Sequence, residues 1–123
     1  MQAPQEQPKK EHCPAETTLA MISGRWKLLI WRELFSGVKR FNELQRSLTG
    51  ITQKMLTQHL REMEADGLVY RKVYAEIPPK VEYSLTETGK SLQPLIEQMH
   101  EWGIEFTVTS HPPGSPVITV DSK

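Results

Sequence analysis

The stretch that decides the fold is residues 41–83, FNELQRSLTGITQKMLTQHLREMEADGLVYRKVYAEIPPKVEY. Apolar residues recur at helical spacing through residues 41–48, which predicts a short helix, and residues 49–51 form a turn. A second helix follows, because Thr52 can cap its start and Gly67 supplies the left-handed residue that helix ends favour. The pattern therefore predicts two helices joined by a sharp turn.

After Gly67 the apolar period changes from about 3.6 to 2. Residues 68–75 and 80–85 alternate and are rich in Val and Tyr, and Pro78 and Pro79 stiffen the connection between them. Residues 38–40 favour a further short strand. A hairpin placed directly after a helix-turn-helix is a wing, so we predict an α+β, mostly α, winged helix-turn-helix with a two-stranded wing.

The second helix has two different faces. Leu56, His59, Leu60 and Met63 form a side that can pack, with His59 expected to be half-buried. The opposite side carries polar and basic residues, namely Gln53, Lys54, Thr57, Gln58 and Arg61. Amides pair bidentately with adenine, and Lys or Arg suits guanine or phosphate. A polar helix face usually meets only water, but the helix-turn-helix and wing around this one favour contact with duplex DNA.

Helices are also expected on both sides of this unit. Pro14 begins a helix that ends near Ile22, with Cys13 as its N-cap, and residues 26–35 are apolar nearly all round, as in a buried helix. Residues 86–106 return to helical spacing, with Pro94 kinking or restarting the helix. Their apolar stripe predicts a dimer interface, together with the first helix. The stripe consists of Leu92, Leu95, Ile96, Met99, Trp102 and Phe106.

The length of 123 residues suits one domain, which we place at residues 12–106, with disordered ends at 1–11 and 107–123. No apolar run is long enough to span a membrane and no secretory signal is visible, so the cytoplasm is the simplest compartment. The net charge is zero, but residues 37–83 carry eight basic and six acidic side chains and residues 84–123 carry two and five. Such separation leaves phosphate attraction possible.

Several motifs taken together resemble one family of winged-helix regulators, the HxlR type. They are Cys13-Pro14, Gly24-Arg25-Trp26, residues 40–44 (RFNEL), 51–56 (ITQKML), 60–69 (LREMEADGLV), 79–86 (PKVEYSLT) and Gly89. The match covers roughly residues 13–103 and is specific as a set. The resemblance implies a bacterial or archaeal transcriptional regulator, a homodimer that binds a palindromic operator, most often as a repressor.

The resemblance makes residues 52–66 the recognition helix, in agreement with the reading of its polar face. Base and phosphate contacts are expected from the recognition helix at Thr52, Gln53, Lys54, Thr57, Gln58 and Arg61. The wing would add phosphate or minor-groove contacts from Arg71, Lys72 and Lys80, and the backbone anchors would be Arg40 and Asn42. No cofactor or metal is expected, because no His, Cys, Asp or Glu group has ligand spacing.

Two interpretations of Cys13 stay open. As an N-cap near Lys9, Lys10 and His12 it would be favoured as a thiolate, and some regulators of the resembled family sense oxidants or electrophiles through a cysteine at this position. Alternatively, it fills a small half-buried site. An enzyme is not expected, because no catalytic set accompanies the thiol. A winged helix that binds proteins without contacting DNA is the alternative function, but it would need an apolar centre on its recognition face.

Overall fold

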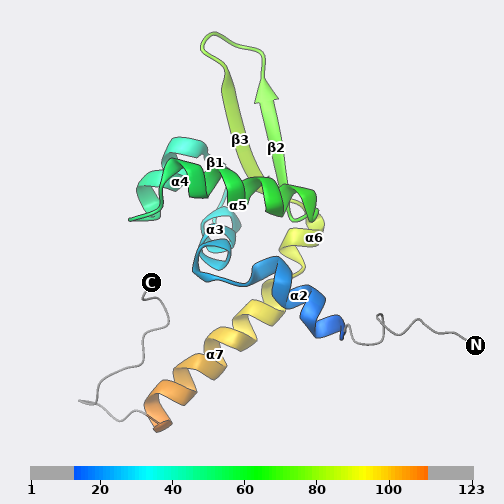
Figure 1. Ribbon diagram of the computed structural model, residues 1–123, viewed down its shortest axis with the longest axis vertical. Coiled ribbons are helices and arrows are strands. Elements are labelled where there is room, and N and C mark those ends of the chain that lie inside the picture. Colours follow the sequence, from blue (N-terminus) through cyan, green and yellow to red (C-terminus); the bar gives the residue numbers. More distant parts are fainter. Residues whose placement is uncertain (1–12, 111–123) are drawn as a thin grey trace, which may run out of the picture.

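A computed structural model describes residues 13–110 and places side chains as far as residue 107. Figure 1 shows the wing and the last helix projecting from opposite ends of the molecule. The elements, labelled as in Figure 1, are α2 (Pro14–Ile22), α3 (Arg25–Phe35), β1 (Lys39–Arg40), α4 (Phe41–Ser47), α5 (Gln53–Ala65), β2 (Val69–Tyr74), β3 (Lys80–Leu85), α6 (Glu87–Lys90) and α7 (Gln93–Ser110). The predicted winged helix-turn-helix is thus confirmed.

The strands form one antiparallel sheet in the order β1-β3-β2. Strands β2 and β3 make the predicted wing, and the register pairs Arg71 with Tyr83 and Lys72 with Glu82. Strand β1 pairs Arg40 with Glu82 on the other edge of β3. This third strand ties the start of α4 to the base of the wing, so the helix-turn-helix and the wing are held in a fixed relation.

The hydrophobic core lies where α3, α5 and the base of the sheet meet. Helix α3 is central, as predicted, but it is not buried all round, since Phe35 is exposed and stacks on buried Trp31 with ring centres 4.9 Å apart. The buried residues are Ile22, Ile30, Trp31, Leu34, Leu44, Leu48, Ile51, Leu56, Leu60, Met63, Leu68, Val69, Tyr83, Leu85 and Ile96.

The short helix α6 is locked to the core through Gly89. The Trp31 indole N–H donates to the Gly89 carbonyl oxygen at 2.7 Å, and the Thr86 hydroxyl caps the helix by accepting from the Gly89 N–H. A Cβ at position 89 would collide with the backbone carbonyl of Leu68, so only glycine allows this close approach.

The expected single helix over residues 86–106 is two helices. The helix is interrupted at Ser91 and Leu92. Pro94 is the second residue of α7, where its missing N–H costs no hydrogen bond, so the proline lies at the start of a new helix. Helix α7 also continues to Ser110, past the predicted domain boundary at 106. The rest of the predicted tail, and the predicted arm at 1–11, lie outside the described residues.

The predicted apolar stripe on α7 divides into two parts. Ile96 is only 7% exposed and Leu92 packs against the same core, so both belong to the subunit's own interior and not to an outward face. The reason is that the first turn of α7 lies against the body of the domain. The outward part of the stripe consists of Leu95, Met99, Trp102 and Phe106.

Candidate nucleic-acid interface

Helix α5 presents a polar face because its opposite side is anchored in the core. Leu56, Leu60 and Met63 are buried, which fixes the rotation of the helix about its axis. The Thr52 hydroxyl oxygen accepts a 3.1 Å hydrogen bond from the Met55 N–H, and this N-cap starts the helix as predicted. The face turned to solvent carries exposed Gln53, Lys54, Gln58 and Arg61 and half-buried Thr57.

A groove of about 490 Å³ runs between this face and the wing. It brings together three predicted contact residues of α5, Gln53, Thr57 and Arg61, with Arg71 of β2. The remaining residues of its lining were not predicted and are Phe41, Leu60, Glu64, Val81 and Tyr83. Only the alternation of the strands could have indicated Tyr83 and Val81, since Tyr83 pairs with Arg71 and Val81 lies two residues away on the same strand face.

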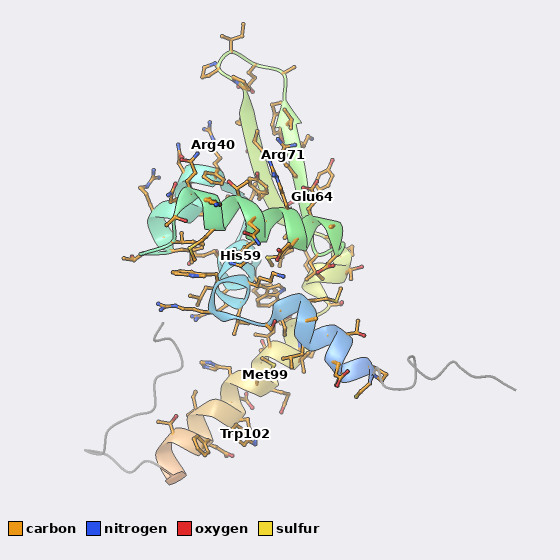
Figure 2. The ribbon with its side chains drawn as sticks, viewed as in Figure 1. Arg40, His59, Glu64, Arg71, Met99 and Trp102 are labelled. Atoms are coloured by element: carbon orange, nitrogen blue, oxygen red, sulfur yellow. The ribbon has the colours of Figure 1, made fainter. Side chains whose placement is uncertain are left out.

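The wing separates its three predicted cations. Arg71 is exposed on the strand face that carries buried Val69, and it lies at the base of the wing above α5 (Figure 2). Successive residues of a strand point to opposite sides, so Lys72 lies on the other face, and Lys80, which pairs with Tyr74, lies there too. The three do not form one phosphate-binding set.

The two lysines on the outer face already have partners. Their ammonium groups lie 4.9 Å (Lys72) and 4.4 Å (Lys80) from the centre of the Tyr74 ring. Lys80 is also 3.8 Å from a carboxylate oxygen of Glu82 and 3.9 Å from one of Glu76. The Tyr74 hydroxyl donates to Glu82 at 3.0 Å. The charges of the two lysines are therefore largely offset by Glu76 and Glu82.

The two predicted backbone anchors lie at the start of α4. Arg40 and Asn42 are both exposed, and Figure 2 shows Arg40 beside the wing. The Arg40 N–H donates to the Glu43 carboxylate at 2.7 Å, which holds the helix start in place and leaves the guanidinium outside. Because Arg40 pairs with Glu82, it lies on the sheet face that carries Lys72 and Lys80, opposite the face of Arg71.

A charged network that the sequence did not indicate lies under one edge of α5. Lys27 of α3 is 2.8 Å from Glu62, and the Gln58 side-chain amide donates to the other Glu62 oxygen at 3.2 Å. The hydrogen bond from Lys27, followed by that from Gln58, holds the pKa of Glu62 below its usual value. No periodicity signals this pair, because Lys27 and Glu62 are far apart in sequence.

His59 is half-buried beside this network, as predicted. Its Nδ1 is buried without a hydrogen-bond partner and lies 3.9 Å from Glu62, beyond hydrogen-bonding distance. Burial lowers the pKa of His59, with a smaller opposing effect from Glu62. His59 is thus a neutral side chain packed on the inner side of α5.

The charge segregation predicted from the sequence is also spatial. The exposed acids Glu97, Glu101 and Glu105 lie on α7, whereas Lys54, Arg61 and Arg71 lie on α5 and the wing. Figure 1 places the distal part of α7 and the wing at opposite ends of the molecule. Attraction of phosphate to the groove is therefore little weakened by the acids of α7, since the screening length is about 8 Å at physiological salt.

Residues 21–111 match the family model described as HxlR-like helix-turn-helix. The chain belongs to this family. HxlR-like proteins are transcriptional regulators with a DNA-binding helix-turn-helix, and this chain is one of them. The groove between α5 and the wing is thus the candidate nucleic-acid interface of an HxlR-like regulator.

Relatives support the assignment to the HxlR-like family. The HTH-type transcriptional regulator YybR of Bacillus subtilis (strain 168) is 56% identical over 96 residues, which cover 78% of this chain and 77% of YybR. Among solved structures, the redox regulator HypR in its reduced form is 53% identical, with a TM-score of 0.73 and coverage of 76% of this chain and 93% of HypR. The reduced form of the regulator YodB from B. subtilis is 36% identical, with a TM-score of 0.71 and coverage of 82% and 97%.

The cysteine of this HxlR-like chain lies at the N-cap of α2, as predicted. Cys13 is exposed and makes no capping hydrogen bond with its side chain, so the alternative that it fills a half-buried site is wrong. The neighbours Lys9, Lys10 and His12 lie outside the described residues. Within residues 13–110, no three His, Cys, Asp or Glu side chains could hold a metal ion, and no helix is long and apolar enough to cross a membrane.

Proposed function

We propose that this regulator acts as a homodimeric repressor that binds a palindromic DNA operator through α5 and the wing of each subunit. The groove between α5 and β2 carries the proposal, since amide, hydroxyl and guanidinium groups converge there from two elements. Amides and arginines are the groups that discriminate base edges in the major groove, and Arg71 would lie against phosphate. A repressor bound in this way excludes other proteins from its promoter.

The dimer is inferred from α7. Its outward side chains include Trp102, which is 68% exposed and stacks on Phe106 with ring centres 5.4 Å apart. An exposed apolar face of this kind marks an interaction surface. A second copy packed on α7 would present two recognition helices, which in such dimers lie about 34 Å apart, in successive major grooves. The operator would then consist of two inverted half-sites.

DNA binding is tested by selecting bound fragments from genomic DNA and measuring their affinity by band shift. Arg61→Ala should weaken binding to the selected site by about 1–3 kcal/mol if Arg61 contacts a base. Lys90→Ala is the matched control, since Lys90 is an exposed cation on α6, away from the groove. If Arg61→Ala binds as tightly as the parent protein, Arg61 does not contact a base, and if affinity does not fall with salt, the proposed DNA binding is overturned.

The dimer is tested by Met99→Glu and Trp102→Glu, each of which places a charge on the outward face of α7. Sedimentation should show a monomer that binds the operator far more weakly. Ile96 is unsuitable, because it is buried and a charge there would unfold the domain. The control for sedimentation is Ile77→Glu at the fully exposed tip of the wing, which should remain a dimer. A dimer that persists in both α7 variants would show that another surface joins the subunits.

We further propose that Cys13 responds to oxidants or electrophiles, either by alkylation or by bridging two subunits. Its exposure supports this, as does the similarity to HypR, a redox regulator. The test compares operator affinity before and after treatment with diamide or a quinone. Treatment should change the affinity of the parent protein and leave Cys13→Ser unaffected. An equal response of both proteins would exclude the thiol as the sensor.

A further inference from the structure

Gln58 is the only predicted contact residue of α5 for which a side-chain hydrogen bond to another described side chain is found. Its amide nitrogen donates to Glu62 Oε2 at 3.2 Å, and Glu62 Oε1 is 2.8 Å from the Lys27 ammonium. Lys27 comes from α3, which packs beneath α5, and its side chain is only 12% exposed. A core helix is thereby connected through one carboxylate to a side chain on the recognition face.

The hydrogen bond to Glu62 determines whether the nitrogen or the oxygen of the Gln58 amide faces Glu62. An ionised carboxylate only accepts hydrogen bonds, so the amide atom turned toward Glu62 must be the NH₂ group. The lowered pKa of Glu62 keeps its carboxylate ionised at neutral pH. The carbonyl oxygen of Gln58 and its second N–H then remain available to a ligand, in one fixed order.

A fixed order of acceptor and donor corresponds to a particular base. Adenine offers the N6 amino group as a donor and N7 as an acceptor in the major groove, and a glutamine amide pairs with both at once. A free glutamine amide can rotate by half a turn and present the reverse order. We propose that Glu62, held by Lys27, is a positioning residue that fixes the Gln58 amide for recognition of an adenine–thymine base pair in the operator.

The Lys27–Glu62 ion pair also reduces the repulsion between Glu62 and DNA phosphates. A carboxylate on a recognition face repels phosphate, but the Lys27 ammonium against Glu62 offsets that charge. A purely structural ion pair between α3 and α5 would affect stability and binding to every DNA sequence alike. A positioning residue changes the preference at one base pair, and this difference makes the proposal testable.

The proposal rests on the proposed function, so the experiment first asks whether the parent protein prefers a selected operator. Each base pair of one half-site is then replaced in turn, and affinities are measured for the parent, Gln58→Ala, Glu62→Ala and the double variant. In the parent, one adenine–thymine pair should be preferred by at least ~5-fold. Gln58→Ala should abolish that preference, Glu62→Ala should reduce it several-fold, and the double variant should resemble Gln58→Ala alone.

Because Glu62→Ala leaves the Lys27 ammonium without its partner, Lys27→Met/Glu62→Ala is measured as well, and thermal unfolding verifies that each variant is folded. Glu62→Ala and Lys27→Met/Glu62→Ala should show the same reduced preference for the adenine–thymine pair. The positioning role would be overturned if the folded Glu62 variants kept the full adenine–thymine preference. It would also be overturned if the Gln58→Ala/Glu62→Ala double variant lost more discrimination than Gln58→Ala does. Either result would leave the proposed function standing. A parent protein with no preferred operator would instead overturn the proposed function, and the positioning role with it.

Discussion

The division of the wing into two faces leads to a prediction about salt. Arg71 lies in the groove beside α5, whereas the adjacent Lys72 points to the opposite side, toward Tyr74 and Glu82. We expect Arg71→Ala to remove a phosphate contact and Lys72→Ala to remove none. The two variants form a matched pair, since each deletes one positive charge from an exposed position of the same strand.

The magnitude follows from counterion release. Each phosphate neutralised on duplex DNA contributes about 0.9 to the slope of log affinity against log salt. A symmetric dimer loses two contacts when Arg71 is replaced, so the slope should flatten by about 1.8. Between 50 and 200 mM salt, the variant should therefore lose about tenfold less affinity than the parent protein. Lys72→Ala should keep the parent slope.

The assay is a fluorescence-anisotropy titration of one selected operator at four salt concentrations. The comparison depends only on differences between slopes, so it does not require the absolute number of contacts. Equal slopes for the two variants, or a larger change for Lys72→Ala, would refute the inference that the face of the wing beside α5 is the one that lies against DNA.

Three other predictions concern stability. Gly89→Ala should lower the free energy of unfolding by about 1–3 kcal/mol, because the new methyl group collides with the Leu68 carbonyl. A calorimetric Tm at least ~4 °C lower is expected, and an unchanged Tm would contradict the collision. Thr52→Ala should cost about 1 kcal/mol in urea unfolding, since the cap of α5 is lost, and no change would exclude the capping role. The free energy of unfolding should decrease as the pH falls below 6.5, because burial lowers the pKa of His59 and the unfolded chain therefore takes up the proton first. His59→Gln should flatten this pH dependence, and an unchanged pH profile would contradict the prediction.

Much of the recognition unit was predictable from local patterns. Thr52 and Gly67 mark the ends of α5, and the 3.6-residue period of its apolar side fixes which residues face solvent. The hairpin was equally clear from its alternation. These features are local, since caps and periodicities act within a few residues along the chain, and they also carry the resemblance to the family.

The stripe on α7 shows where local patterns fail. Periodicity shows that Leu92, Ile96 and Met99 share one side of a helix, but not what covers that side. In the folded chain the first turn of α7 packs on the core and buries Ile96, while Met99 points outward from the projecting part of the helix (Figure 2). Contact with residues distant in sequence decides which part of a stripe remains free.

The sequence by itself determined the order of elements, the polar face of α5 and the separation of charge along the chain, because each depends on near neighbours. Only the tertiary structure decided which wing cation joins the groove, why position 89 must be glycine and how Lys27 and Glu62 orient Gln58. These three depend on strand pairing and helix packing between segments far apart in sequence, and such contacts exist only once the chain has folded.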